Sequence, residues 1–165
     1  MLVTSMSSQN IKVLPDLKVD STKIKITEMG SNGNNSIYYA YTSFDTERKD
    51  SLIVTISTMG TSLTTLRIDF THEPTAYITL WSDYNEFDGK DTKRVEFEVY
   101  LLEINTTTLN KGDWVYGRFR GVSKPIKNSI GTYRIEFLGE FSHQIGTIRL
   151  KKKEEESYRI ITEDP

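Results

Sequence analysis

The sequence contains no cysteine, and this absence excludes several kinds of chemistry at once. Without a thiol there is no disulfide framework, no cysteine nucleophile, and no zinc or iron–sulfur centre held by thiolates. A chain of 165 residues does not need such cross-links, because a domain of this length buries roughly 70% of its unfolded surface. We therefore expect a domain that folds without a metal or cofactor.

Histidine, a basic excess and long apolar runs are also scarce or missing. The two histidines, His72 and His143, form no H-x-H or H-E-x-x-H pattern, so they are a poor set of metal ligands. The 21 basic and 23 acidic residues give a net charge of -2, which argues against a nucleic-acid partner because such proteins carry a basic excess. No apolar run approaches the ~20 residues of a membrane helix, so we expect no transmembrane segment.

The beginning of the chain has neither the basic start nor the full apolar stretch of an intact signal peptide. We expect residues 1–16 to be a flexible N-terminal segment and residues 17–165 to form one domain, which is an ordinary domain length. The absence of cysteine leaves the compartment open, because a domain this large can function outside the cell without disulfides.

What the sequence does contain is alternation of apolar and polar residues between clusters of Gly, Asn, Asp and Pro, the pattern typical of strands. We expect strands at residues 18–28, 36–44, 51–58, 63–70, 76–82, 93–104, 113–122, 132–141, 147–151 and 157–162. No segment has a helical stripe. This pattern predicts an all-β fold: an antiparallel β-sandwich of about nine or ten strands, with an up-and-down β-barrel as the alternative.

The alternation is clearest in segment 93–104. One face is expected to carry Val95, Phe97, Val99 and Leu101, and the other Glu96, Glu98 and Tyr100. Segment 132–141 repeats the pattern, with its aromatic residues and Ile135 on one face. Each apolar face is predicted to pack on the core, because successive side chains of a strand point to opposite faces.

Two stretches echo each other, Tyr116-Gly117-Arg118-Phe119 and Leu138-Gly139-Glu140-Phe141. Two neighbouring strands of one sheet would produce this pattern, with each glycine marking a bulge, a bend or a bulky cross-strand neighbour. The surrounding residues 111–146, which read KGDWVYGRFRGVSKP and then GTYRIEFLGEFSHQIG, resemble the C-terminal strands of small secreted or lipid-anchored proteins of unknown function in Bacteroidota. The resemblance implies a β-sandwich and a secreted or cell-envelope location, and it supplies no active site.

The first candidate site is the outer face of strand 113–122. If Val115 points to the core, the opposite face carries Trp114, Tyr116, Arg118 and Arg120. Aromatic and arginine side chains in a row can stack on sugar rings or bases. The favoured interpretation is structural, because glutamates of the neighbouring strands would pair with the two arginines in a cross-strand ladder.

The second candidate site is the loop after strand 76–82, which contains Trp81, Asp83 and Tyr84. Aromatic and oxygen-bearing side chains of such a loop can frame a sugar site or hold Ca²⁺. The spacing of a calcium loop fails, however, because Phe87 and Asp88 stand where a ligand and a glycine belong. Ordinary turn chemistry is favoured, and no metal site is expected.

A third possibility is a jelly-roll glycoside hydrolase that uses Glu96 and Glu98 as paired carboxylates. Simple alternation on a solvated face explains these residues equally well. The sequence has no nucleophile elbow, phosphate loop or dinucleotide-binding turn.

We therefore expect a non-enzymatic binding or structural module of a bacterial envelope or secreted protein set, with a glycan or other extended polar molecule as the expected ligand. The alternatives are the jelly-roll hydrolase and a protein-interaction domain that docks through an edge strand.

Overall fold

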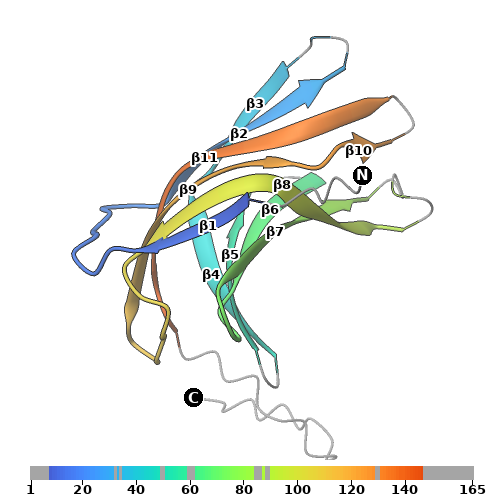
Figure 1. The fold of residues 1–165 in the computed structure, drawn as a ribbon. Helices are drawn as coiled ribbons and strands as arrows, with labels where there is room; N and C mark the ends of the chain where they lie inside the picture. Colours follow the sequence, from blue (N-terminus) through green and yellow to red (C-terminus); the bar gives the residue numbers. More distant parts are fainter. Residues whose placement is uncertain are drawn as a thin grey trace, which may run out of the picture.

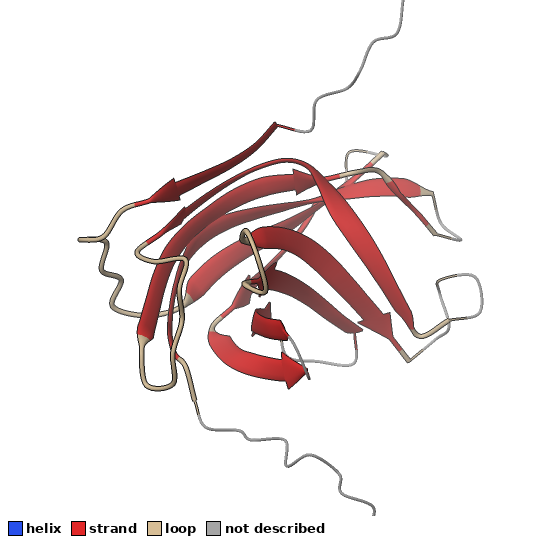
Figure 2. Ribbon diagram, turned by 60° about the horizontal axis from the view of Figure 1, so that its bottom comes forward, coloured by secondary structure: helices blue, strands red, loops and turns tan. Residues whose placement is uncertain are grey.

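The computed structural model describes residues 8–31, 33, 35–48, 51–58, 62–83, 87, 90–128 and 131–146. Within these ranges the secondary structure consists of strands, and Figure 2 shows them as one strongly curved assembly. The strands are β1 (Ser8–Val13), β2 (Lys23–Gly30), β3 (Asn35–Ala40), β4 (Thr42–Arg48), β5 (Ser51–Ser57), β6 (Ser62–Asp69), β7 (Thr75–Ser82), β8 (Thr92–Ile104), β9 (Trp114–Ser123), β10 (Ile126–Lys127) and β11 (Thr132–Gln144). The described residues include no helix that could cross a membrane.

The strands form one sheet in the order β3-β2-β11-β9-β8-β7-β6-β5-β4, and all neighbours on this path are antiparallel. The first and last strands of the path, β3 and β4, follow each other in the chain with only Tyr41 between them. The sheet therefore curls round until β4 contacts β11 (Figure 1). The predicted all-β, antiparallel fold is confirmed, as a sheet nearly closed into a barrel.

Each strand predicted between residues 18 and 141 overlaps an observed strand. The prediction for residues 36–44 covers parts of two strands, because the chain changes its pairing partner from β2 to β5 at Tyr41. The strands predicted at 147–151 and 157–162 lie outside the described residues.

Strand β1 lies in the segment for which the sequence predicted no strand. Residues 8–13 pair in parallel with the second half of β8, where Ile11 packs against the core. Space for β1 exists because β7 pairs with β8 only as far as Glu96. The polar start of β1, Ser8-Gln9-Asn10, gives almost no alternation, and the edge that it covers is created by strands far away in the sequence.

A bulge in β8 reverses the predicted faces of that strand. The register with β9 shifts between Phe97 and Val99, so that Glu98 is an additional residue. After the bulge, Tyr100 is buried, whereas Val99 is 45% exposed and Leu101 lies half-buried on the outside. The prediction that Val99 and Leu101 face the core is wrong, because it assumed unbroken alternation and one extra residue exchanges the two faces.

Strands β9 and β11 fit together through reciprocal pairs of glycine and phenylalanine. Gly117 is the cross-strand partner of Phe141, and Phe119 is the partner of Gly139. A Cβ atom on Gly117 would lie 2.2 Å from Cζ of Phe141, so only a glycine leaves room for the ring. Both rings are buried in the core. The predicted structural role of these two glycines is confirmed.

Two tyrosines on the inner face have raised pKa values. Burial raises the pKa of Tyr100, although the backbone N–H of Ala76, which donates to its phenolic oxygen at 3.3 Å, lowers it. Burial also raises the pKa of Tyr38, and a hydrogen bond to the carboxylate of Glu28 raises it further. Both phenols therefore stay neutral at pH values at which an exposed tyrosine begins to ionise.

Candidate functional site

The outer face of the sheet carries side chains in rows that run across the strands. Cross-strand partners place Lys12, Glu103, Arg118, Glu140 and Lys23 in one line, which we call the charged row. The adjacent line, which we call the central row, consists of Leu101, Arg120, Leu138, Lys25 and Tyr39. Because these residues alternate with buried ones along each strand, their side chains lie on the side opposite to the core.

The charged row alternates in sign from β1 to β2. Within this row an ion pair joins Nε of Arg118 to Oε2 of Glu140 at 3.9 Å, with about half of each side chain exposed. An exposed pair at this distance contributes little to the free energy of folding. The predicted ion-pair ladder is therefore confirmed for Arg118.

The central row lacks acidic residues. Arg120 lies between two leucines, Leu101 and Leu138, as its cross-strand partners, and no ion pair joins it to another described residue. Leu138 is 53% exposed. The prediction of a glutamate partner is wrong for Arg120, because the register places apolar residues beside it and shifts the glutamates to the neighbouring rows.

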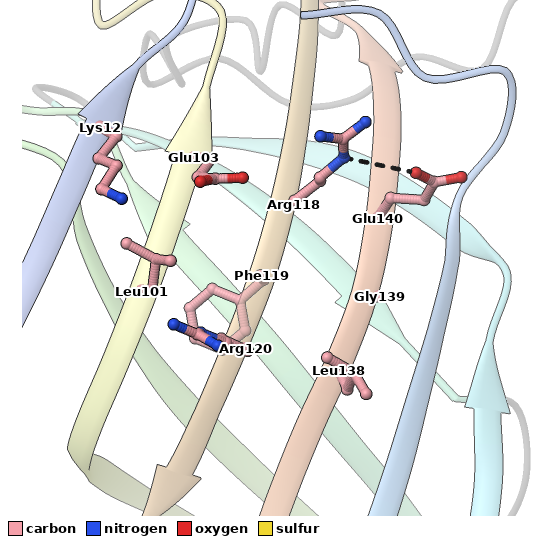
Figure 3. A pocket seen from close by; sticks show the side chains of 9 residues that line it. All are labelled: Lys12, Leu101, Glu103, Arg118, Phe119, Arg120, Leu138, Gly139 and Glu140. Carbon is pink, nitrogen blue, oxygen red and sulfur yellow. Dashed lines mark ion pairs between the residues drawn. The ribbon is translucent and has the colours of Figure 1, made fainter.

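Two open hollows flank this part of the central row. The first, about 490 Å³, lies between the central row and the charged row (Figure 3). The second, about 390 Å³, extends toward Val99 and Glu136. Both hollows are lined by Lys12, Leu101 and Arg120. The guanidinium that lacks a carboxylate partner therefore belongs to both hollows.

An aromatic pair continues the outer face of β9. The rings of Trp114 and Tyr116 are stacked, with centroids 5.8 Å apart and planes 5° apart. Asn105 holds this end of β9: its side-chain amide donates to the carbonyl of Trp114 at 3.0 Å and accepts from the backbone N–H of Tyr116 at 2.8 Å. The structure thus places Trp114, Tyr116, Arg118 and Arg120 on one face, as the sequence predicted.

No known family model, curated protein or solved structure matches the chain. The resemblance of residues 111–146 to Bacteroidota proteins stays a prediction, and the site has to be interpreted from its own chemistry.

The second predicted site lies elsewhere. Trp81 pairs with Thr92, the first residue of β8, whereas Gly117 of β9 pairs with Ile104, the last residue, and Trp114 lies beyond it. The length of β8, at about 3.3 Å per residue, separates the two tryptophans by roughly 40 Å of strand. Asp83 is exposed at the end of β7, and Tyr84 lies outside the described residues. One ligand contacting both tryptophans would have to span the whole strand.

Glu96 and Glu98, the paired carboxylates of the hydrolase hypothesis, each contact an arginine. Nε of Arg94 lies 2.8 Å from Oε1 of Glu96, and Arg134 of β11 forms an ion pair with Glu98. All four side chains are at least 40% exposed. Their geometry is that of solvated surface ion pairs.

A partly buried Ser–His–Asp set lies where β4 contacts β11. Nε2 of His143 lies 3.0 Å from Oδ1 of Asp45, and Nδ1 lies 3.1 Å from Oγ of Ser43. The His143 and Asp45 side chains are only 10% and 5% exposed. Spacing in the sequence could not reveal this set, because β4 and β11 are about 100 residues apart.

These three side chains act first as a structural connection. They join β4 to the end of β11, and Ser43 also lies within hydrogen-bond distance of the carbonyl of Ser142. The backbone N–H of Gly146 donates to Oδ1 of Asp45 at 3.3 Å, which adds a further link. Among the described residues, no three acidic, histidine or cysteine side chains come together as a metal site. We interpret the set as a group of polar contacts that holds β4 against the end of β11.

Proposed function

We propose that the protein is a non-enzymatic binding module whose central row binds an elongated anionic ligand. The observation that carries this proposal is the position of Arg120: a permanent cation that faces two leucines in a hollowed surface. The other outer-face arginines named above, Arg94, Arg118 and Arg134, each have a carboxylate partner.

The surroundings of Arg120 suit an anion. A guanidinium presents a planar set of donors that matches carboxylate, sulfate or phosphate oxygens in pairs. Both cross-strand partners of Arg120 are leucines, so no carboxylate of the same row competes with a ligand for the guanidinium. The carboxylates of Glu103, Glu136 and Glu140 lie in the rows on either side. They would repel an anion there, so a bound anion would have to lie over the central row.

We also propose that the sheet is an up-and-down β-barrel rather than a sandwich. The order of the strands, in which β2 to β9 pair mostly with their chain neighbours and β11 returns to β2, supports this architecture. Aromatic and branched side chains of the core lie on the inner face, and the two hollows described above lie on the outer face. A place in a bacterial envelope or secreted set remains part of the proposal and rests on the resemblance of residues 111–146.

The test is a titration of the purified chain with short anionic oligomers, followed by calorimetry. We expect Arg120→Gln to weaken binding by about 10- to 100-fold, since a charge-assisted hydrogen bond contributes about 1.5–3 kcal/mol. Lys124→Gln is the matched control, because it removes the same charge at an exposed position. Equal losses in both variants, or no binding of any anion, would refute the proposal.

A second candidate function, docking of a protein through an edge strand, is favoured by β3. This strand ends the strand order, and its sequence NSIYYA contains no charge and no proline to block pairing. Its outward side chains Ile37 and Tyr39 are 54% and 41% exposed, and Tyr41, which follows the strand, is 60% exposed. Such an edge can add a strand from a partner. Ile37→Lys should abolish a complex of this kind, whereas Arg120→Gln should leave it intact.

A further inference from the structure

The central row also indicates the class of the ligand. We infer that it binds an acidic polysaccharide in which charged and uncharged sugars alternate, lying across the strands from Leu101 to Tyr39. This inference rests on the proposed function, since it assumes that Arg120 binds an anion.

The two cations of the central row lie two strands apart. Arg120 of β9 and Lys25 of β2 are separated by one strand, β11, which contributes Leu138 between them. Adjacent strands lie about 4.8 Å apart, so the backbone positions that carry the two cations are about 9.6 Å apart across the sheet. This distance corresponds to the length of a disaccharide. Consecutive carboxylates of an alternating polymer would then meet Arg120 and Lys25 in turn.

Apolar and aromatic side chains lie between and beyond the two cations. Leu101, Leu138 and Tyr39 occupy the alternate positions of the row, so that cations and apolar side chains alternate across the strands. Sugar rings have apolar C–H faces, which pack on aliphatic and aromatic side chains. The uncharged sugar of each repeat would therefore lie over an apolar residue while its charged neighbour lies over a cation.

The central row ends in an aromatic pair. The ring of Tyr39 lies 5.8 Å from the ring of Tyr41, at an angle of 30°, and both residues are exposed. The ammonium group of Lys23 is 5.5 Å from the centre of the Tyr39 ring. Together they form an exposed platform at the edge of the sheet, on which the last sugar of a bound segment can stack.

Other anionic polymers fit less well. A nucleic-acid strand carries a charge on every unit and would bring phosphates against the carboxylates of Glu103, Glu136 and Glu140 in the neighbouring rows. An extended acidic peptide repeats the side chains of one face about every 6.8 Å, which is shorter than the spacing of about 9.6 Å between the backbone positions that carry the cations. Alternating charge at the disaccharide repeat avoids both conflicts.

The experiment titrates the full chain with a hexasaccharide of alternating glucuronic acid and N-acetylglucosamine. The comparison ligands are a hexamer of galacturonic acid, a neutral cello-oligosaccharide, hexathymidylate and a short polyglutamate. Far-UV circular dichroism and thermal unfolding confirm that each variant is folded. We expect the alternating hexasaccharide to bind tightest, and Arg120→Gln and Lys25→Gln each to weaken it at least 10-fold. Lys124→Gln should leave its affinity unchanged.

The possible outcomes distinguish a failure of the inferred sugar ligand from a failure of the proposed anion binding. If hexathymidylate, polyglutamate or the fully charged hexamer binds tighter and Arg120→Gln weakens it, the inference about the sugar is overturned while the proposed function stands. The same holds if Lys25→Gln leaves binding of the alternating hexasaccharide unchanged. If no anion binds, both are overturned. Tighter binding of the alternating hexasaccharide with loss in both variants supports both.

Discussion

Replacing Gly117 by alanine tests the reciprocal packing of β9 and β11. A Cβ atom at this position would lie 2.2 Å, 2.4 Å and 3.0 Å from three ring atoms of Phe141. Carbon atoms in favourable contact are about 3.5–4.0 Å apart, so the ring would have to move by more than about 1 Å. Phe141 is fully buried among other core side chains, so this movement would have to displace them.

The expected cost follows from overpacking. Adding one methyl group to a well-packed core costs about 1–3 kcal/mol, and a collision this close belongs at the upper end. Replacing glycine also removes conformational freedom from the unfolded chain, which offsets about 0.4–1 kcal/mol. We therefore expect the Gly117→Ala variant to lose about 2–2.6 kcal/mol of unfolding free energy. For a chain of this length the melting temperature should fall by roughly 4–10 °C.

A double-mutant cycle with Phe141→Leu tests whether the cost of Gly117→Ala comes from steric overlap with the ring of Phe141. Leucine lacks the distal ring atoms, so Gly117→Ala should cost less than about 1 kcal/mol in the Phe141→Leu background. Urea unfolding of the four proteins gives the coupling free energy. A cost that is the same in both backgrounds, or below about 0.5 kcal/mol in the wild type, would refute the reasoning.

Two further predictions concern buried polar groups. His143→Ala should lower the free energy of unfolding, measured in urea, by about 3 kcal/mol, because it leaves the carboxylate of Asp45 buried without its histidine partner. Adding Asp45→Asn to the His143→Ala variant should recover part of this loss. Stability should also fall as the pH rises above about 10, since the unfolded chain then releases the phenolic proton that the fold retains on Tyr100. Tyr100→Phe should show a smaller loss of melting temperature between pH 9 and pH 11.

Each of these two predictions can be contradicted by the same measurement that tests it. A His143→Ala cost below about 1 kcal/mol would mean that the Ser–His–Asp set is solvated and does not hold β4 against the end of β11. An equal loss between pH 9 and pH 11 in the wild type and in Tyr100→Phe would place the alkaline sensitivity on other groups.

Much of the fold could be predicted from alternation, because that pattern depends only on neighbours in the sequence. It placed Val115 and Phe119 in the core and set Trp114 and Arg120 on the opposite face. It failed at the bulge in β8, where one extra residue, Glu98, leaves no local signal in composition. Strand β1 was missed because it depends on an edge that other strands create.

The sequence predicted which residues share the outer face of β9, but it could not predict their neighbours on other strands. The sequence places Arg118 and Arg120 on one strand face, but their partners depend on the register of β8 and β11. That register decides that Arg118 meets a glutamate while Arg120 meets two leucines. Lys25 and Tyr39 join the row only through strands that are about 100 residues away from β9 or β11 in the chain. No signal in a single sequence specifies such pairings.

The closure of the sheet has a consequence for folding kinetics. Oγ1 of Thr22 donates to the carbonyl of Ser142, 120 residues away, beside the pairing of β2 with β11. The entropy of closing so long a loop is lost before the new contacts compensate for it, so hairpins between chain neighbours should form first and the joining of β2 to β11 last. Until that step, an intermediate built from β5 to β9 has two unpaired edges, and we expect refolding to become slower and prone to aggregation as the protein concentration rises.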